Sequence, residues 1–399
     1  MPHCLLREVK LPSLPFEKEG YRFVFEAQKY NDLSQSLILV KFGEFEFFLR
    51  KRYRKRKNDF ILKCEKISRN LPTGIIKGAI RILALHNQEA LISHNLDNDS
   101  LRQKLLSPFY KKVEDFLGFS SVFRLEIGFG SGRHLLYQAE RNPSVQFIGI
   151  EIHTPSIEQV LRQIELRKLQ NILLINVDAR VFLELLPSHL CEAIYLHFPV
   201  PWGKKPHRRV WNKQFLKEAL RILKKEGVLE LRSDDEGYFA YALEIALREK
   251  NLQCKINKNL KKEIVSKYED RWLRQHKDIY DLQIFAFEER AEIKEEFDFS
   301  FEDFELSSFL SHMGFATIPK KLVQSDWFLD IDSFYLCEEA CILRASFGDF
   351  NQPQNKFVLI DKGGKTRYCG GNPLPTLASS KAHKVLQKII KGEDVECGD

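Results

Sequence analysis

From about residue 120 to residue 290, short apolar strands alternate with amphipathic helices, and this pattern constrains the fold more than any other feature. Apolar side chains run continuously through the predicted strands. Strands of this kind are typical of a parallel sheet that is covered by helices on both faces. We therefore predict a doubly covered α/β domain with strands at 122–128, 145–151, 171–178, 192–198, 228–234 and 280–288.

The residues at helix ends predict where some of the covering helices begin and stop. Thr154 is expected to cap the N-terminus of a helix that extends to about residue 169, with Pro155 at its first helical position. A later helix begins near residue 212 and is expected to end at Gly227. Further helices are predicted from about residue 133 and over 236–250.

The segments on either side of this domain have a different composition. Aromatic and β-branched residues dominate 21–28 and 36–52, which predicts a β-rich N-terminal domain. The last part of the chain mixes predicted strands with a helix that ends at Gly392. We therefore expect three domains, namely a β-rich domain (1–118), the α/β domain (119–290) and a small α+β domain (291–399), without an internal repeat.

Composition excludes several classes of protein. The 399 residues carry a net charge of +7 and eight cysteines, none of them in a Cys-x-x-Cys pair. No Cys/His set has the spacing of a zinc site, so we expect plain thiols and no metal. The start of the chain lacks the apolar core of a signal peptide, and no apolar run reaches the roughly 18 residues of a membrane helix. We expect a cytoplasmic protein without membrane contact. The sequence leaves the oligomeric state open, and we favour a monomer.

A basic run, RKRYRKRK, occupies residues 50–57 and contains seven cations in eight positions. One interpretation is a solvated hairpin edge that is protected from aggregation by its charge. The other is a strand or loop that contacts phosphates of a nucleic acid. We favour the second interpretation, in which the N-terminal domain contacts RNA.

The first strand of the α/β domain runs into a glycine-rich loop, LEIGFGSG, that contains Glu126, Gly128, Gly130 and Gly132. Alternating glycines allow a tight turn and a close approach of the backbone to a ligand, just before a helix N-terminus. The spacing is G-x-G-x-G with an acid two residues ahead, and not the G-x-G-x-x-G of dinucleotide-binding proteins. A tight turn without any ligand remains the alternative.

Two further acids follow the next two strands. Glu151 ends the second strand, where a carboxylate is expected to accept hydrogen bonds from ribose hydroxyls, and Asp178 ends the third. Asp178 is placed to accept a hydrogen bond from the exocyclic amine of adenine. Each acid alone would be an ordinary surface carboxylate. Together with Glu126 and the glycine-rich loop, they predict a pocket for S-adenosylmethionine.

The loop after the fourth strand, HFPVPWGKKPHRR, combines two prolines, an aromatic ring and a basic cluster. Pro199 and Pro201 remove backbone donors and stiffen the loop, and Trp202 offers a face on which a base can stack. No acid occurs between Glu192 and Glu218. A core tryptophan beside a solvated charge cluster is the alternative. The cations predicted to contact an anionic partner are Lys204, Lys205, His207, Arg208, Arg209 and Lys213.

With these stretches in view, residues 120–288 resemble the tRNA (guanine-N7-)-methyltransferase family. The resemblance rests on LEIGFGSG, FIGIEIH, NVDA, LHFPVPWGKKPHRRV, LRSDDEGY and SKYEDR, in this order. It implies a class I, Rossmann-like S-adenosylmethionine-dependent methyltransferase that methylates N7 of guanine 46 in the variable loop of tRNA. By position, Glu126, Glu151 and Asp178 match the cofactor-binding acids of the family, and the loop chemistry adds Gly128, Gly130 and Gly132. Lys204, Asp234, Ser266, Lys267, Tyr268 and Glu269 match its substrate-binding positions, and the loop chemistry adds Trp202, Arg208 and Arg209.

Val200 departs from the family pattern, because members usually read F-P-D-P-W and that aspartate is regarded as catalytic. Guanine N7 already has an in-plane lone pair and loses no proton on methylation, so a general base is not obligatory. We expect Asp234 or Glu269 to offset the charge that develops on the purine. Two other interpretations remain: a tRNA-binding protein that lost the chemistry at Val200, and a methyltransferase for another base or a small molecule.

Overall fold

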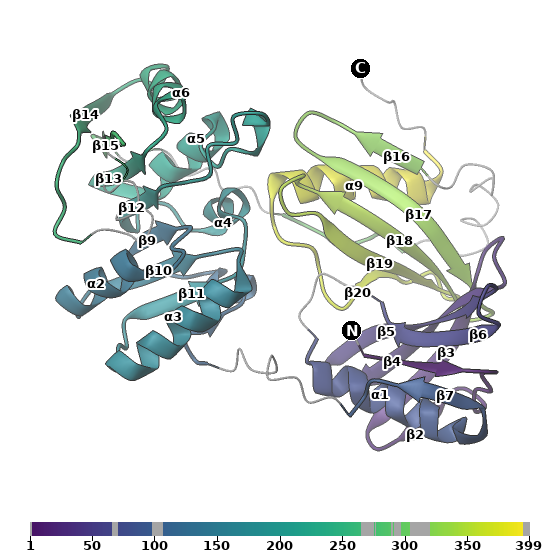
Figure 1. Ribbon diagram of the computed structural model, residues 1–399. Helices are drawn as coiled ribbons and strands as arrows, with labels where there is room; N and C mark the ends of the chain where they lie inside the picture. The colour runs from purple at the N-terminus through teal and green to yellow at the C-terminus, as the bar shows by residue number, and fades with distance from the viewer. Residues whose placement is uncertain are drawn as a thin grey trace. The chain divides into compact units, whose positions relative to one another are not determined.

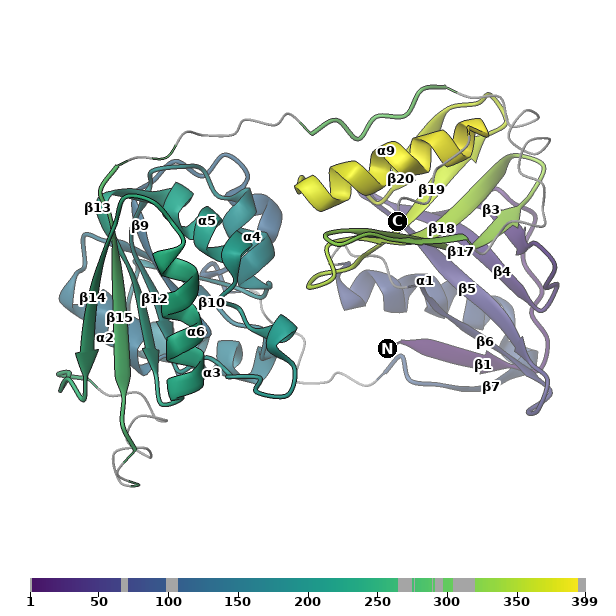
Figure 2. The same cartoon turned by 90° about the horizontal axis from the view of Figure 1, so that it is seen from above.

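The computed structural model describes residues 2–65, 71–97, 107–264, 275, 277–288, 290, 297–303 and 320–393. The chain divides into two compact units, drawn in Figures 1 and 2. Unit 1 combines Met1–Gln103 with Glu296–Asp399, and unit 2 is Lys104–Glu295. The division differs from the three domains that we predicted, because the two segments that flank the α/β domain share one sheet.

Unit 2 is built on an eight-stranded sheet with the order β14-β15-β13-β12-β9-β10-β11-β8. The neighbours from β13 to β8 pair in parallel, whereas β15 pairs antiparallel with both β13 and β14. The predicted α/β domain is therefore confirmed. The strands are β8 (Tyr110–Lys111), β9 (Phe123–Ile127), β10 (Gln146–Ile150), β11 (Ile172–Ile175), β12 (Cys191–His197), β13 (Leu223–Ser233), β14 (Leu252–Lys258) and β15 (Tyr280–Ala286).

Two separate apolar cores cover the two faces of this sheet. The helices α2 (Arg133–Arg141) and α3 (Thr154–Arg167) pack on one face, over β10 and β11. The helices α4 (Ala179–Leu185), α5 (Lys213–Ile222) and α6 (Glu236–Leu247) pack on the other face, over β9, β12, β13 and β15. This doubly covered arrangement is visible in Figure 2.

Three local predictions need correction. The helix that we expected to reach Gly227 ends at Ile222, because Leu223 already pairs with Cys191 and begins β13. His153 is the N-cap of α3, and Thr154 is its first helical residue. The strand β14 was not predicted, although Leu252, Cys254 and Ile256 alternate with polar residues as in a half-buried strand.

Unit 1 is a twelve-stranded sheet whose main order is β20-β19-β18-β17-β3-β4-β5-β6-β1-β7. The N-terminal segment contributes β1 (His3–Leu6), β2 (Phe16–Lys18), β3 (Tyr21–Lys29), β4 (Gln35–Phe42), β5 (Phe45–Arg54), β6 (Asp59–Cys64), β7 (Leu91–His94) and the helix α1 (Thr73–His86). The C-terminal segment contributes β16 (Lys320–Val323), β17 (Phe328–Leu336), β18 (Ala340–Gly348), β19 (Gln354–Asp361), β20 (Thr366–Cys369) and the helix α9 (Leu377–Lys391).

The two halves of unit 1 have the same order of elements. In each half a four-stranded meander, β3–β6 or β17–β20, is followed by a helix that covers one of its faces. The motif FGEF (42–45) follows the second strand of the first meander, and FGDF (347–350) follows that of the second. Leu-Pro-Thr precedes the helix in both halves, at 71–73 and at 374–376. Our expectation of no internal repeat was therefore wrong.

The halves meet edge to edge and face to face. Lys29 of β3 pairs with Tyr335 of β17, and Gln28 pairs with Leu336. The faces that the helices leave uncovered share one apolar core, in which the rings of Phe48 and Phe357 lie 4.8 Å apart. Unit 1 therefore folds one continuous sheet into two layers, one from each meander, which pack face to face between the two helices. A repeat whose halves are separated by unit 2 explains why the N- and C-terminal segments are not separate domains.

Candidate functional site

The glycine-rich loop connects β9 to α2 at the carboxyl edge of the parallel strands. Gly128, Gly130 and Gly132 have φ angles of +69°, +52° and +70°, a conformation that L side chains rarely adopt. A Cβ atom on Gly132 would lie 2.5 Å from Cγ2 of Val160, whereas one on Gly128 would meet nothing within 4 Å. Gly132 is thus required by packing, and the loop beside Gly128 borders open space that a ligand can enter.

Glu151 follows β10 and is 9% exposed. Its Oε2 accepts a hydrogen bond of 2.9 Å from the backbone N–H of Gly130, and its Oε1 accepts from the N–H groups of Ile152 and His153. The carboxylate therefore holds the end of the second strand against the glycine-rich loop. This places Glu151 beside the loop, as its position in the sequence predicted.

Asp178 caps the N-terminus of α4, three residues beyond the end of β11. Its Oδ1 accepts from the backbone N–H of Arg180 at 2.9 Å, and its Oδ2 accepts from Nη2 of the same arginine at 2.7 Å. Arg180 thus fixes the orientation of this carboxylate. The strand β11 ends at Ile175 and not at residue 178 as predicted, so Asp178 belongs to the start of α4, with an arginine partner that the sequence pattern did not predict.

The Glu126 side chain lies against the sheet face that carries α2, whereas Glu151 and Asp178 lie beyond the ends of their strands. It lies within β9, is 4% exposed, and its Oε2 is 2.8 Å from Nδ1 of His134 on α2. In the sheet it is the register partner of Tyr195 on β12. Among its described contacts, Glu126 therefore joins a polar cluster on the sheet face that carries α2.

The loop after β12 contains two left-handed residues that are not glycine. Phe198 has φ +50° and Trp202 has φ +46°. The backbone N–H of Phe198 donates to the carbonyl of Arg232 on β13 at 2.7 Å, which fixes the start of the loop. Val200 is 61% exposed and Trp202 is 36% exposed, so both side chains reach the surface. The alternative of a core tryptophan is therefore wrong.

The predicted cations of this loop have different surroundings. Lys204 and Arg208 are exposed, and the Arg208 guanidinium lies 5.1 Å from the centre of the Trp202 ring. Arg209 is only partly exposed. Its Nε donates to the carbonyl of Pro201 at 2.8 Å, and its guanidinium lies over the ring of Tyr241 on α6 at 4.5 Å. In this structure Arg209 supports the loop, whereas Lys204 and Arg208 face solvent.

Asp234 follows β13, the strand next to β12. Its Oδ2 lies 3.0 Å from Nζ of Lys277, and its side chain is 18% exposed. The other predicted substrate residues, Ser266, Lys267, Tyr268 and Glu269, lie outside the described residues. The structure therefore brings Asp234 to the same sheet edge as Trp202 and leaves the position of the SKYE segment as a prediction.

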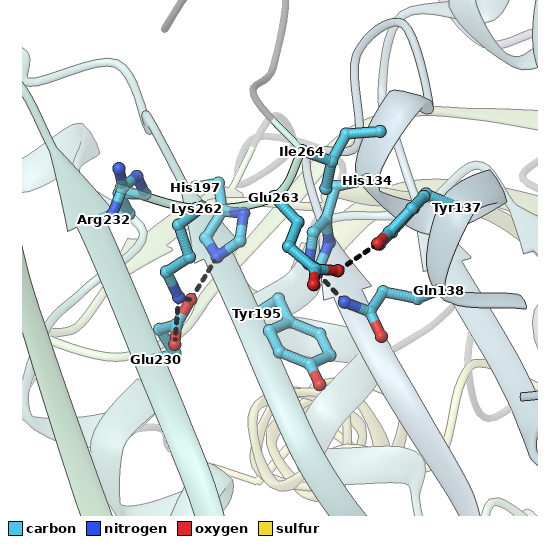
Figure 3. A pocket seen from close by; sticks show the side chains of 10 residues that line it. All are labelled: His134, Tyr137, Gln138, Tyr195, His197, Glu230, Arg232, Lys262, Glu263 and Ile264. Carbon is cyan, nitrogen blue, oxygen red and sulfur yellow. Dashed lines mark hydrogen bonds and ion pairs between the residues drawn. The ribbon is translucent and has the colours of Figure 1, made fainter. Parts of the chain in front are cut away.

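A polar cluster that sequence reasoning missed covers the middle of the sheet on the α2 face. It borders a cavity of about 290 Å³ that Figure 3 shows from close by. Glu230 of β13 is its centre: its Oε1 is 2.8 Å from Nε2 of His197, and Lys262 bonds to both of its oxygens at 2.7 and 2.8 Å. The signal was present in VLELRS, where Glu230 and Arg232 interrupt an apolar strand at a spacing of two.

Burial and ion pairing determine the protonation of this cluster. Burial disfavours ionisation of Glu230, but it is outweighed by the hydrogen bond from His197, the charge that His197 carries in acid and the Lys262 ammonium. The pKa of Glu230 therefore lies well below its usual range. Burial lowers the pKa of His197 despite the attraction of Glu230. Near neutral pH the ring of His197 is therefore uncharged, and its Nε2–H donates to an ionised Glu230.

The residues that the structure describes show neither a metal centre nor a membrane-spanning helix. They contain no group of three or more His, Cys, Asp or Glu side chains arranged to hold a metal ion. None of the helices in these ranges is long and apolar enough to cross a membrane.

The comparison with known proteins points to one family. A family described as "Putative methyltransferase" matches residues 120–282. A tRNA (guanine-N(7)-)-methyltransferase from Helicobacter hepaticus is 49% identical over 98% of this chain and 100% of the relative. Proteins with the same name from Wolinella succinogenes and Helicobacter pylori are 44% and 40% identical, with 98% and 99% of this chain and 100% of each relative covered. The similarity extends through both units, and the chain belongs to the tRNA (guanine-N(7)-)-methyltransferase family.

Proposed function

We propose that this chain transfers the methyl group of S-adenosylmethionine to N7 of guanine 46 in the variable loop of tRNA. The observation that supports this most is the arrangement of one sheet edge. The glycine-rich loop after β9, with open space beside Gly128, lies on the strand next to the one that ends in the exposed loop of Trp202. A cofactor loop and a base-stacking loop on neighbouring strands allow a donor and an acceptor to meet.

The residues of the cofactor half fit S-adenosylmethionine, which supplies an electrophilic methyl group on a sulfonium. The backbone at Gly128 and Gly130 would approach the cofactor closely, with Gly132 required for the turn. Glu151 and Asp178 would accept hydrogen bonds from the ribose and the adenine, in orientations that Gly130 and Arg180 already restrict. Glu126 would act from the adjoining sheet face, where His134 orients it.

The residues of the acceptor half fit a guanine attached to phosphates. Trp202 would stack on the base, and Arg208 already lies over the same ring as a cation–π partner. Lys204 would contact phosphate or base. We assign Ser266, Lys267, Tyr268 and Glu269 to substrate binding by their position in the family motif, while Arg209 holds the loop in place through Pro201 and Tyr241.

Val200 does not prevent this chemistry. N7 of guanine attacks with a lone pair and releases no proton, so proximity and alignment supply most of the rate enhancement. A carboxylate beside the purine would offset the positive charge that develops during transfer. We assign that part to Asp234 and Glu269. Lys277 orients the Asp234 carboxylate from 3.0 Å.

Unit 1 would extend the surface that contacts tRNA. In the basic run, Arg50 pairs with Glu65 at 2.7 Å, Lys51 pairs with Glu26, and Arg54 pairs with Asp59. Their charges are compensated within the unit. The exposed cations at the turn between β5 and β6 are Lys55, Arg56 and Lys57. Because β5 lies between β4 and β6, the interpretation of the basic run as a sheet edge does not apply. We propose that this turn contacts phosphates of tRNA in the cytoplasm.

Replacing Lys55, Arg56 and Lys57 with glutamine tests this surface. Each lost phosphate contact reduces the slope of log affinity against log salt by about 0.7–0.9, so three contacts predict a reduction of about 2–3. The slope is measured by fluorescence anisotropy with labelled tRNA between low and physiological salt. The charge-neutralising change Lys10→Gln, at an exposed lysine of unit 1, is the control. An unchanged slope would mean that Lys55, Arg56 and Lys57 are solvated and contact no phosphate of the tRNA.

The direct test of the activity is incubation of the protein with tRNA and methyl-labelled S-adenosylmethionine, followed by chemical cleavage at N7-methylguanine. We expect label in tRNA and one cleavage at guanine 46. Label without cleavage at N7 would favour a methyltransferase for another base. Bound tRNA without any label would favour the catalytically impaired tRNA-binding protein.

A further inference from the structure

The chain just before the SKYE segment is attached at three points, two on β13 and one on α2. The carbonyl of Leu260 accepts a hydrogen bond of 2.9 Å from Nη2 of Arg232. Lys262 bonds to Glu230, and Glu263 bonds to Tyr137 and, at 3.0 Å, to Arg141 on α2. Ser266 follows Ile264 by two residues in the sequence. We refer to residues 260–263 as the tether.

The centre of these attachments is buried, whereas the tether itself is partly exposed. The Glu230 side chain is 5% exposed and that of Lys262 is 28% exposed. Glu230 also accepts from Nε2 of Gln283 at 2.8 Å. Lys262, His197 and Gln283 therefore converge on one carboxylate from three different elements, as Figure 3 shows for the first two. A buried carboxylate with this many donors has a fixed orientation.

The attachment of the Leu260 carbonyl rests on a second buried ion pair. Arg232 is 2% exposed and pairs with Asp281, which is 1% exposed, at 2.6 Å. Replacing an ion pair of this kind with apolar residues is often neutral or stabilising, so stability alone does not account for it. The pair does hold one face of the guanidinium in place, and the other side of that group donates to the Leu260 carbonyl.

We propose that Glu230 and Lys262 are positioning residues for tRNA binding. Their ion pair fixes the tether against β13, and the sequence continues from the tether to Ser266–Glu269. The proposal rests on the substrate-binding role assigned above to those four residues. Neither Glu230 nor Lys262 touches the reacting atoms, and both act through the segment that follows the tether.

The ion pair thereby holds Lys262, four residues before Ser266 in the sequence, in one place on the sheet face before tRNA binds. A group that is already held in place loses less conformational entropy when a ligand binds beside it. The consequence concerns tRNA affinity. Cofactor affinity depends mainly on the glycine-rich loop, Glu151 and Asp178, none of which contacts the tether through a described interaction. Glu126 is linked to Glu230 only indirectly, through the rings of His134 and His197, and His134 holds Glu126 in every variant.

Two single variants and their double test this proposal in the full-length protein. Lys262→Met removes the ammonium and keeps Glu230 bonded to His197 and Gln283. Glu230→Gln removes the charge and keeps the shape of the side chain. We expect each to raise the KM for tRNA about tenfold, with kcat and the Kd for S-adenosylmethionine within a factor of about two. The double variant should add little to either single one, because both break the same contact.

Two further variants separate positioning from general stability. Lys255 is an exposed lysine on β14, in register with Gln283, and Lys255→Met should leave every parameter unchanged. Lys262→Arg keeps a cation opposite Glu230 and should restore the KM for tRNA. A purely structural role would lower the fraction of active enzyme, and hence kcat, with no change in KM. That result, or a weaker cofactor affinity in Lys262→Met, would overturn the proposal.

The affinity for tRNA is also measured without turnover, by fluorescence anisotropy. If the unaltered protein binds tRNA but transfers no methyl group to N7, the proposed function fails. The comparison of Lys262→Met, Lys262→Arg and Lys255→Met in binding still decides whether the tether positions the segment. Equal affinities of these three variants would reject it.

Discussion

The sheet edge that carries the proposed site has a cofactor half, formed by residues 128–132, Glu151 and Asp178, and an acceptor half, formed by residues 198–209 and Asp234. The two halves are held in shape by different means. In the cofactor half, positive φ angles fall on Gly128, Gly130 and Gly132, and backbone N–H groups orient Glu151. In the acceptor half, positive φ angles fall on Phe198 and Trp202, whose side chains make this conformation costly by about 1–3 kcal/mol each.

Side chains of neighbouring elements compensate for that strain. Arg209 holds the acceptor loop through the carbonyl of Pro201 and the ring of Tyr241, and Arg232 accepts the N–H of Phe198 with its backbone carbonyl. The cofactor half is thus organised by its own backbone, and the acceptor half by contacts with β13 and α6. Substitutions should therefore affect the two halves in different ways.

The largest effect is expected from the acids of the acceptor half. Asp234→Ala combined with Glu269→Ala should lower kcat by about 10²–10³, the usual cost of removing electrostatic stabilisation of a transition state. The affinity for S-adenosylmethionine should stay close to that of the unaltered protein, because the cofactor half is organised separately. Single-turnover kinetics and calorimetric titration of the cofactor measure the two quantities.

The result has a matched control in Lys277→Met, which removes the partner of Asp234 and keeps the carboxylate. We expect this variant to retain most of the turnover. Full turnover in the double variant would contradict the assignment of both acids. Loss of cofactor binding would contradict the separation of the two halves.

The cofactor half could be predicted from the sequence, whereas much of the acceptor half could not. Alternating glycines before a helix are typical of a tight turn with positive φ angles, so the motif LEIGFGSG was enough to predict the conformation of this loop. Arg209 looks like its neighbours in a basic cluster, and only the position of Tyr241 on α6 distinguishes it from Arg208. Glu230 reads as a solvated residue in a strand until β12 and the tether place His197 and Lys262 beside it.

The same distinction holds for the fold. Continuous apolar strands predicted unit 2 because both faces of each strand are buried locally by helices. The end of α5 was misjudged because Lys224, Lys225 and Glu226 suit a helix, and only the pairing of Leu223 with Cys191 stops it. The pairing of Lys29 with Tyr335 joins residues more than 300 positions apart in sequence, and no local pattern encodes it.

The next largest effect compares two glycines of the cofactor half. Gly132→Ala and Gly128→Ala both place an alanine at positive φ, which costs about 1–2 kcal/mol. Only Gly132→Ala also brings a Cβ atom 2.5 Å from Val160. We expect Gly132→Ala to destabilise unit 2 by a further ~1–3 kcal/mol. Gly128→Ala should mainly weaken the binding of S-adenosylmethionine, because its Cβ enters the open space.

Denaturant unfolding and cofactor titration of the two alanine variants separate these outcomes. Equal loss of stability would mean that Val160 yields without cost. Unchanged cofactor affinity in Gly128→Ala would mean that the open space beside the loop is not where the cofactor binds.

A smaller effect is expected from Val200→Asp, which restores the residue that the family usually carries. The side chain is 61% exposed, so the fold should tolerate the change. An aspartate at this place would share the electrostatic work of Asp234 and Glu269, and we expect kcat to rise about tenfold. A fall in kcat would show that the acceptor loop has adapted to valine. The gain should be larger in the Asp234→Ala, Glu269→Ala background if the three acids serve the same purpose.

The smallest effect concerns pH and His197, the last residue of β12 before the acceptor loop. Burial lowers the pKa of His197 below its ordinary value of 6.5 in the folded state. The unfolded chain therefore binds this proton more readily, so the stabilisation is complete above pH 6.5 and declines as the pH falls below it. Glu230 contributes mainly below pH 5, because its ordinary pKa is 4.5 and folding lowers it further.

The comparison of the unaltered protein with His197→Gln isolates this contribution. His383 of unit 1 also has a pKa lowered by burial, but it is present in both proteins and cancels. We expect the free energy of unfolding to fall more steeply with decreasing pH in the unaltered protein than in His197→Gln. Equal slopes in denaturant titrations at pH 7.5, 6.5, 5.5 and 5 would mean that His197 is as easily protonated when folded as when unfolded. The buried cluster beneath the acceptor half would then be open to water.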